Sequence, residues 1–316
     1  MQGTVAITDH GWYEFLLQQP DLDEVNFWTP SASHAFHAPP NSPFFFKLKA
    51  PYRHAICGYG VFYKFDRLPD VIAWEWFGPR NGCPTLAAMQ DRIHKIREGM
   101  HYRGTRPPSE IGCILVVQPI FFSPDQWVDG PRDWPDRNLR PMHYDLTAGE
   151  GQRIWQECLA RTPYANLLPE QPKAAAVAAD GPRVGAPVLV QPRLGQGTFR
   201  VAVMDASYQR ACAITLEHSV PALDASHIKA WAADGPNEVR NGILLRADLH
   251  RLFDQGYITV TPDLRLEVSA RLRADYGNGR SYYPSHGSLI TVPPNPAERP
   301  AAEFLRWHND HVFLAA

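Results

Sequence analysis

Residues 212–254 read CAITLEHSVPALDASHIKAWAADGPNEVRNGILLRADLHRLFD and contain three polar side chains of the kinds that catalyse reactions. His227, Asn241 and His250 follow one another in the order His-Asn-His. The local pattern predicts a short strand around His227, a loop around Asn241 and a helix that begins just before His250. The stretch therefore indicates a small α+β unit in which a strand, a loop and a helix each present one of these side chains.

The spacing within the predicted helix suggests a cation site. His250 and Asp254 are four residues apart, so they share a helix face and could bind one cation together. Asn241, with Gly242 beside it, either offers an amide oxygen to a metal or ties its loop together through hydrogen bonds. Spacing leaves the alternatives open: a structural histidine on the strand, an ordinary amphipathic helix, and a helix-end cap or ion pair for Asp254.

The neighbours of these residues extend the pattern. The relevant pieces are CAIT (212–215), ASHIK (225–229), NGILL (241–245) and DLHRLFD (248–254), together with GQGTFR (195–200), GYITV (256–260) and the late pair Trp307-His308. They resemble the HNH endonuclease superfamily, the ββα-metal nucleases, and within it a branch described as restriction endonucleases. This resemblance covers nearly all of residues 193–316.

The resemblance implies hydrolysis of a phosphodiester bond, which requires an activated water and stabilisation of charge on the phosphate and the leaving oxygen. His227 would be the general base, because an imidazole with a pKa near neutrality can accept the proton of the water. His250 would be a metal ligand, and Asn241 a ligand or a residue that fixes the loop.

One position departs from the family pattern. Ser226 precedes the expected base, where many members carry Asp or His, and serine is a poor ligand for divalent metals. Asp254 is the substitute that helical geometry suggests. Mg²⁺ or Mn²⁺ fits such an N/O site better than structural zinc does.

Basic residues flank the motif and offer contacts to DNA phosphates, which position a protein without reading bases. They are Arg200, Arg210, Lys229, Arg240, Arg246 and Arg251. Lys229 and Arg246 lie nearest to the two histidines in sequence, so we predict that these two contact phosphate. The alternative is that they are only solvated surface charges.

Composition limits the remaining possibilities. The chain has 316 residues, of which 44% are hydrophobic and 20% charged, and this length suggests two domains. A net charge of -2 argues against coating nucleic acid by bulk charge, so DNA binding must come from local patches. The five cysteines indicate neither disulfides nor a zinc site. There is no secretory signal and no apolar run near the roughly 18 residues that span a bilayer, so we expect a cytoplasmic protein without a membrane segment.

Residues 167–192 read LLPEQPKAAAVAADGPRVGAPVLVQP. This segment is rich in Pro, Ala and Gly, which predicts an exposed linker. It divides the chain into a first domain at 1–166 and a nuclease domain at 193–316. Beyond the linker we expect a helix or strand at 198–206, strands at 212–215 and 222–229, a helix at 246–253, a hairpin of 257–261 with 264–269, and a closing helix at 301–313.

The first domain is rich in aromatic and β-branched residues. Strands are predicted at 24–29, 44–49, 55–65, 71–77 and 111–122, and helices at 85–98 and 152–160. They imply a mostly antiparallel, curved sheet or barrel, which loosely resembles the PUA-like folds, including the EVE and SRA readers of modified bases. A base-flipping reader needs aromatic walls and polar groups, for which Asn26, Trp28 and Tyr59 are candidates. The alternative is that they belong to the core of the sheet.

Together these features predict a metal-dependent endonuclease that cuts double-stranded DNA carrying modified bases, such as a modified cytosine, in defence against phage. Double-strand cleavage favours a homodimer on DNA. Two other hypotheses remain open: a nucleic-acid-binding protein with a degenerate HNH region, and a structure-specific repair nuclease.

Overall fold

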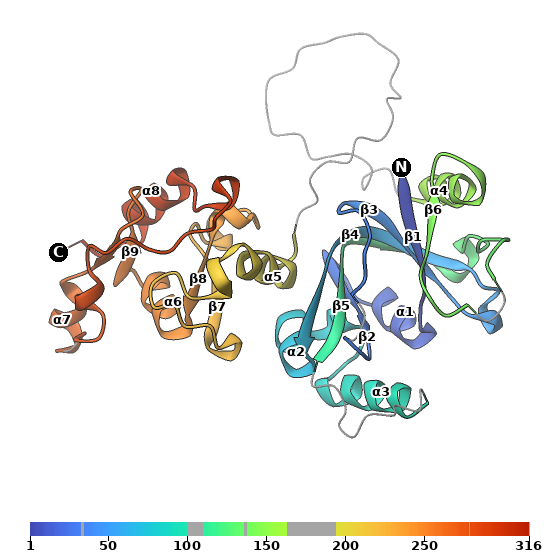
Figure 1. Ribbon diagram of the computed structural model, residues 1–316, viewed down its shortest axis with the longest axis horizontal. Helices are drawn as coiled ribbons and strands as arrows, with labels where there is room; N and C mark the ends of the chain where they lie inside the picture. Colours follow the sequence, from blue (N-terminus) through green and yellow to red (C-terminus); the bar gives the residue numbers. More distant parts are fainter. Residues whose placement is uncertain (33–34, 100–109, 136–137, 163–193, 278, 316) are drawn as a thin grey trace, which may run out of the picture. The chain divides into compact units, whose positions relative to one another are not determined.

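The computed structural model describes residues 1–32, 35–99, 110–135, 138–162, 194–277 and 279–315. The chain forms two compact units, Met1–Arg193 and Leu194–Ala316, and each is described by itself (Figure 1). The predicted linker at 167–192 lies outside the described residues. Within the described residues, every helix is too short or too polar to cross a membrane.

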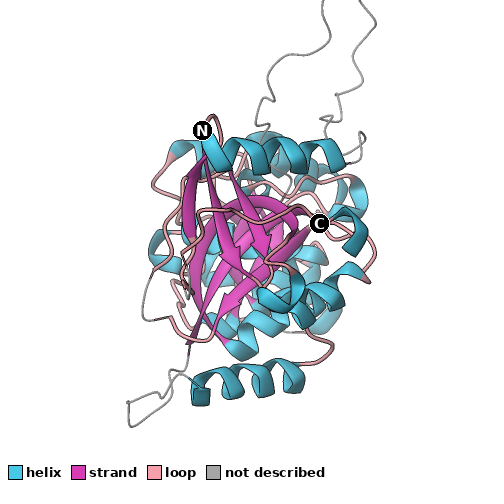
Figure 2. Cartoon of the chain, turned by 90° about the vertical axis from the view of Figure 1, so that its right-hand side faces the viewer, coloured by secondary structure: helices cyan, strands magenta, loops and turns pink. Residues whose placement is uncertain are grey.

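The N-terminal unit is built on a six-stranded sheet in the order β2-β5-β4-β3-β1-β6. The strands are β1 (Gln2–Ile7), β2 (Glu24–Thr29), β3 (Ser42–Lys47), β4 (Ile56–Pro69), β5 (Glu110–Phe121) and β6 (Met142–Asp145). β1 and β3 run parallel, and the other neighbouring pairs are antiparallel. The strands twist strongly, and within the described residues β2 and β6 are unpaired edges, so the sheet is open and does not close into a barrel (Figure 2).

The described residues of this unit include four α-helices: α1 (His10–Leu17), α2 (Asp70–Phe77), α3 (Leu86–Gly99) and α4 (Gly149–Arg161). The apolar run of β3 explains how two of them pack, because successive side chains of a strand point to opposite faces. Phe44 and Phe46 join a core cluster with Trp12 of α1, whereas Phe45 joins a second cluster with Ile154 of α4. A strand buried on both faces reads as a continuous apolar run, as it does here.

The mixed α+β class and most of the predicted elements are confirmed, but the strand predicted at 71–77 is wrong. This segment is the helix α2. Its buried residues are Ile72, Ala73, Trp76 and Phe77. They recur at intervals of one, three and four residues, which is helical spacing and does not alternate as a strand would. Pro69 precedes the first helical residue and Gly78, at φ 49°, ends the helix.

The C-terminal unit contains a two-stranded hairpin followed directly by a helix. Its elements are α5 (Gln196–Ala206), β7 (Leu223–His227), β8 (Gly242–Arg246), α6 (Ala247–Asp254), β9 (Ile258–Val260), β10 (Leu266–Val268), α7 (Arg271–Tyr276) and α8 (Ala302–His311). β7 pairs antiparallel with β8, and β9 with β10. The strand predicted at 212–215 is wrong: this segment is a turn, in which the Cys212 Sγ accepts a hydrogen bond from the Arg246 amide at 3.3 Å.

Candidate functional site

The site is organised by the β7–β8 hairpin and by α6, which packs on both strands. His227 ends β7 and pairs with Gly242 at the start of β8. A Cβ on Gly242 would lie 2.4 Å from Val203 and 3.0 Å from the Phe199 ring. Glycine is therefore required at this position for α5 to pack against the hairpin, and this packing brings Phe199 to His227.

The His227 ring is held on two sides. It stacks on Phe199 with a centroid separation of 4.0 Å and an interplanar angle of 13°. Its Nε2 lies 2.7 Å from Oδ1 of Asn237, whose Nδ2 donates to the Leu194 carbonyl at 2.6 Å. Because Nδ2 of Asn237 is committed as a donor, its Oδ1 accepts, and Nε2 of His227 must carry the proton. Nδ1 is then the basic nitrogen, and it has no hydrogen-bond partner among the described residues.

The environment keeps this imidazole neutral. Burial lowers the pKa of His227 below its usual 6.5, and the nearby His250 lowers it further, while the hydrogen bond to Asn237 opposes them. A His227 side chain with a lowered pKa is uncharged at pH 7 and can accept a proton.

His250 lies between two carboxylates. Its Nδ1 is 3.3 Å from Oδ2 of Asp224, and its Nε2 is 3.2 Å from Oδ2 of Asp254. Burial would lower the pKa of His250, but the hydrogen bonds to Asp224 and Asp254 outweigh this effect and raise it to about 9. The same contact holds the pKa of Asp224 below its usual value. The structure thus places the two histidines in opposite states: neutral at His227 and protonated at His250.

Asp224 is the acidic residue that sequence reasoning missed. Ser226, immediately before His227, is fully buried, and its Oγ has only a 3.5 Å contact with the His227 carbonyl. Asp224, two residues earlier on β7, is half-buried and reaches His250. The sequence feature that could have pointed to Asp224 is its position as an acidic side chain within the predicted strand at 222–229.

Asn241 is fully enclosed and bonded to backbone. Its Oδ1 accepts from the Lys229 amide at 2.9 Å, and its Nδ2 donates to the carbonyls of Lys229 at 3.0 Å and Pro236 at 2.9 Å. These three bonds close the loop between β7 and β8. In this geometry Asn241 fixes the loop that carries Asn237 towards His227.

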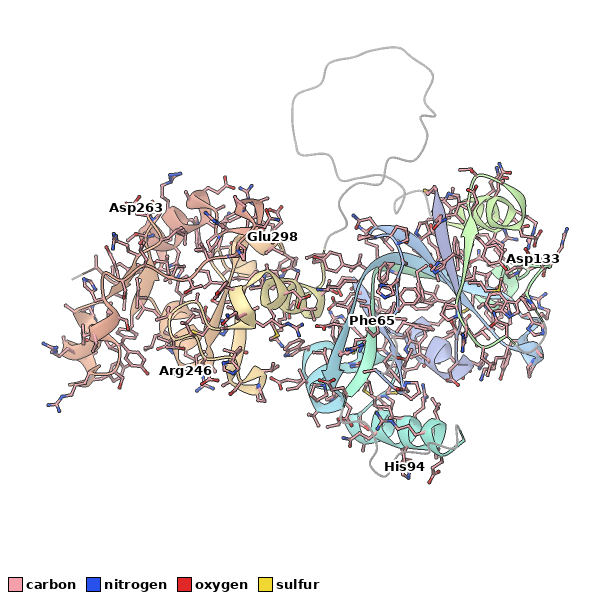
Figure 3. All side chains as sticks on the ribbon, viewed as in Figure 1. Phe65, His94, Asp133, Arg246, Asp263 and Glu298 are labelled. Carbon is pink, nitrogen blue, oxygen red and sulfur yellow. The ribbon has the colours of Figure 1, made fainter. Side chains whose placement is uncertain are left out.

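The two basic residues expected at phosphate both have partners within the chain. Arg246, which is labelled in Figure 3, makes a two-pronged ion pair with Asp248 at 2.6 and 2.8 Å. The Tyr282 hydroxyl donates to the same carboxylate at 3.1 Å. The arginine holds the pKa of Asp248 at about 2. The Nζ of Lys229 lies 5.8 Å from the centroid of the Trp307 ring.

The donor set at Asp224 and His250 can be tested against the needs of a divalent metal. Among the described residues no group of three or more His, Cys, Asp or Glu side chains is arranged to hold a metal ion. Mg²⁺, however, usually keeps several waters and takes only one or two protein carboxylates together with substrate phosphate. One carboxylate and one imidazole at 3.3 Å fit that incomplete shell, whereas they do not fit a closed structural zinc site.

The three residues predicted to line a pocket for a modified base do not lie together in the N-terminal unit. Asn26 is fully buried on β2, and its Nδ2 donates to Oδ1 of Asn81 at 2.9 Å. Trp28 donates from its indole nitrogen to the Asn81 carbonyl at 2.9 Å. Tyr59 belongs to the other core cluster, where its hydroxyl lies 2.8 Å from Oγ1 of Thr162. Asn26 and Trp28 thus meet at Asn81, and Tyr59 lies elsewhere in the core.

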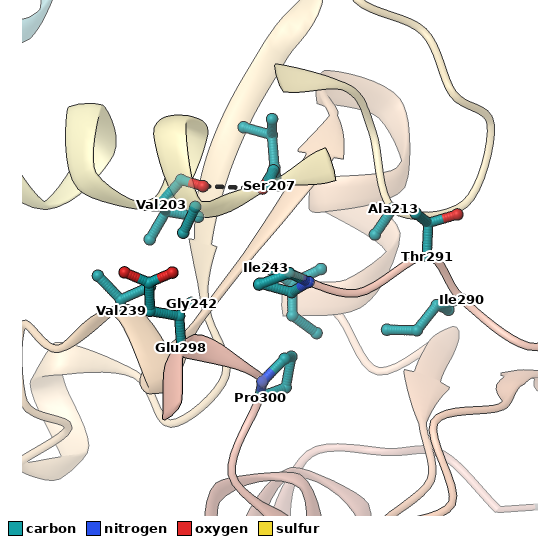
Figure 4. A pocket seen from close by; sticks show the side chains of 13 residues that line it. Val203, Ser207, Ala213, Val239, Gly242, Ile243, Ile290, Thr291, Glu298 and Pro300 are labelled. Carbon is teal, nitrogen blue, oxygen red and sulfur yellow. Dashed lines mark hydrogen bonds between the residues drawn. The ribbon is translucent and has the colours of Figure 1, made fainter. Parts of the chain in front are cut away.

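A small, largely apolar pocket lies beside α5 and β8 (Figure 4). Val203 of α5 and Ser207, the residue that follows this helix, line one side, and Ile243 of β8 and Ile290 line another. The Ser207 hydroxyl is already used, since it donates to the Val203 carbonyl at 2.7 Å. The lining includes none of His227, His250, Asp224 and Asp254, so this pocket is separate from the histidine site.

Comparison with known proteins gives one match that covers the site. Residues 212–261 match the HNH endonuclease family. The match supports nuclease activity at the level of the family, with DNA as the substrate class and a divalent metal as the cofactor class. No curated protein matches the chain.

Among solved structures, the chain is similar to the crystal structure of ASCH from Zymomonas mobilis at 9% identity and a TM-score of 0.32, covering 50% of this chain and 94% of that one. It is also similar to a single-residue mutant of the same protein at 8% identity and a TM-score of 0.32, covering 49% and 96%.

Proposed function

We propose that this protein is a metal-dependent DNA endonuclease that restricts foreign DNA carrying modified bases, with His227 as the general base. The observation that supports it best is the state of His227, which lies in the segment that matches the HNH family. Its Nε2 is committed to Asn237, its pKa is lowered, and its Nδ1 has no partner among the described residues. A general base needs this combination of a fixed tautomer and an available nitrogen.

In the proposed mechanism, Nδ1 of His227 takes a proton from a water whose oxygen bonds to the phosphorus. The bond from phosphorus to the 3′-oxygen breaks, its electron pair stays on that oxygen, and solvent water protonates it to the 3′-hydroxyl. Asn237 keeps the imidazole in the required tautomer, and Phe199 restricts the orientation of its ring. Asp224 and His250 would hold the divalent cation, Mg²⁺ or Mn²⁺, which when bound supplies positive charge to stabilise the phosphate and the leaving oxygen. Asn241 preserves the loop that connects these groups.

The remaining site residues have narrower roles in this proposal. Asp254 would offer the cation a second carboxylate. It contacts Nε2 of His250, whereas Asp224 contacts Nδ1. Lys229 can reach DNA from its position over the Trp307 ring. Arg246 can contact a phosphate only by exchanging its two bonds to Asp248.

The N-terminal unit is proposed to read the modified base. Oδ1 of Asn26 is buried and lacks a hydrogen-bond partner among the described residues, close to Asn81 and the half-buried Trp28. A buried amide oxygen without a partner is costly, and it is the kind of group that accepts a hydrogen bond from the edge of a base. Substituting Asn26 by Ser should therefore weaken any preference for modified DNA without affecting cleavage chemistry.

The decisive assay compares modified phage DNA with an unmodified plasmid, in Mg²⁺ or Mn²⁺ and with an EDTA control. We expect cleavage of the modified DNA alone. Equal cleavage of both substrates would contradict the requirement for modification, and no cleavage with either metal would contradict the nuclease.

Two variants make the assay specific for the site. His227→Ala should abolish cleavage, whereas His218→Ala, at an exposed histidine of the same unit, should leave it unchanged. Preferential cutting of branched or nicked DNA would instead indicate a repair nuclease, and DNA binding without cleavage would indicate a degenerate site. Sedimentation of the complex with DNA would show whether two copies assemble for double-strand cleavage.

A further inference from the structure

The basic residues around the site differ in whether the chain already neutralises them. Four of the six have partners: Arg210 pairs with Asp205, Arg240 with Glu303, Arg246 with Asp248, and Lys229 lies over Trp307. Arg200 and Arg251 have no ion pair, hydrogen bond or ring contact from their side chains within the part of the chain that the structure describes. They are therefore the two flanking cations that remain available to an outside anion.

These two arginines come from the two helices that enclose the catalytic strand. Arg200 follows Phe199, whose ring stacks on His227, and Arg251 follows His250. Their helices, α5 and α6, both pack on β7. Both guanidinium groups lie within electrostatic range of Asp224, and Arg200 also lies within range of His227. The two charges thus belong to the immediate surroundings of the proposed chemistry.

The charge of the site explains why such cations are needed. Asp224 and Asp254 place two carboxylates beside His250, and a phosphate, itself an anion, needs cationic partners to approach such a site. A guanidinium can bind phosphate through two parallel hydrogen bonds, so an arginine without a carboxylate partner is suited to this contact.

We propose that Arg200 and Arg251 bind the backbone phosphate that is presented to His227, one from the α5 side and the other from the α6 side. This assignment rests on the proposed nuclease function, because it names the residues that hold the substrate of the same site. It differs from the prediction based on distance along the sequence, in which Lys229 and Arg246 contact phosphate.

The test measures binding of the full chain to a fluorescent 20-base-pair DNA duplex in EDTA, which prevents cleavage, between 50 and 200 mM salt. The variants are Arg200→Gln, Arg251→Gln and the double variant, with Arg240→Gln as the matched control at an arginine already paired with Glu303. Each lost phosphate contact should reduce the slope of log K against the logarithm of salt concentration by about 0.9. The loss of affinity between the lower and the higher salt concentration should then be about 3-fold smaller than in the wild type. The double variant should lose about twice as much, and the control should match the wild type.

Slopes of Arg200→Gln and Arg251→Gln equal to that of the wild type would overturn the assignment, as would absence of DNA binding by the wild type. Circular dichroism spectra confirm that each variant folds. A metal-dependent cleavage assay then separates this inference from the nuclease proposal. Reduced slopes without cleavage by the wild type would keep the phosphate site and refute the nuclease, whereas cleavage with unchanged slopes would refute only the phosphate site.

Discussion

Nδ1 of His250 lies 3.3 Å from Oδ2 of Asp224, although the two residues are 26 positions apart in the chain. The pairing of β7 with β8 and the helix that follows bring them together. In the proposed site this contact supplies the carboxylate that is missing at position 226, where the side chain is a buried serine hydroxyl. It also explains why His250 retains its proton in the metal-free protein.

Asp224→Asn should therefore weaken metal binding more than Asp254→Asn does. Asp224 is half-buried beside Nδ1 of His250, whereas Asp254 is exposed to solvent, which can replace its contribution. We expect a loss of at least about 10-fold in Mn²⁺ affinity for Asp224→Asn and a smaller loss for Asp254→Asn. Titration calorimetry measures both, and equal affinities for Asp224→Asn and the wild type would show that the carboxylate does not hold the metal.

The same contact predicts a pH dependence of stability in EDTA. The pKa of His250 is raised to about 9 in the folded protein, above about 6.5 in the unfolded chain. Its contribution is therefore fully present below pH 6.5 and is lost as the pH rises through 9. We expect Asp224→Asn to cost about 1–2 kcal/mol at pH 6 and little at pH 10. Urea unfolding at the two pH values tests this, and a cost that grows with pH would contradict it.

Asn237 should control the acid limb of the cleavage rate. Because the pKa of His227 is lowered, the active neutral form should persist somewhat below pH 6.5. Asn237→Asp places a carboxylate against Nε2, which raises the pKa of His227 and should move the acid limb to higher pH. Asn237→Ala should lower kcat by about 10- to 100-fold, because the tautomer is no longer fixed. An acid limb that is the same in wild type and Asn237→Asp would mean that another group titrates.

Substitutions of Asn241 distinguish between its two possible roles, as a metal ligand or as a residue that fixes the loop. If its three backbone bonds are its role, Asn241→Ala should lower the free energy of unfolding by about 2–4 kcal/mol. Asn241→Asp should also destabilise, since it sets a carboxylate oxygen against the carbonyls of Lys229 and Pro236. A metal ligand would respond differently: Asn241→Asp would fold normally and bind metal at least as tightly. Asn295→Ala, at an exposed helix cap, is the control.

The site segment could be predicted from the sequence because its residues resemble the HNH family, whereas spacing alone left structural alternatives open. The strand, loop and helix around His227, Asn241 and His250 follow from side-chain periodicity. Asp224 and Asn237 were missed because their roles depend on where the hairpin pairs and how its loop folds back, which no local spacing specifies. Asp248 is only two residues from Arg246, but the two-pronged ion pair between them depends on the conformation of both side chains at the start of α6, which sequence spacing does not specify.

The same limit applies to the N-terminal fold. The apolar runs that form β2, β3, β4 and β5 were found, because a continuous or alternating apolar strand has a clear local signal. The segment of α2 contains aromatic and β-branched residues that favour strands, and only its burial against the sheet shows the helical spacing. The parallel pairing of β1 with β3 joins strands about 40 positions apart, as the register of Thr4 with Phe44 shows, and cannot be derived from either strand alone.

Lys47 allows a prediction for the N-terminal unit. This side chain is only 1% exposed and has no carboxylate partner among the described residues. Its Nζ contacts the Leu48 carbonyl at 3.4 Å and Nδ1 of His54 at 3.2 Å, and it lies 4.6 Å from the centroid of Trp134. Burial lowers the pKa of Lys47, which means that its charge is held at a cost in free energy.

Lys47→Met should therefore stabilise the N-terminal unit by about 1–2 kcal/mol at pH 7, because it fills a similar volume without the buried charge. The gain should shrink as the pH rises towards 10.5, since the folded wild type releases the proton of Lys47 before the unfolded chain does. Scanning calorimetry of the full chain at pH 7 and pH 10 measures the shift, with Lys49→Met as the exposed control. A lower melting temperature for Lys47→Met would show that the contacts of the ammonium with His54 and Trp134 outweigh the cost of burying it.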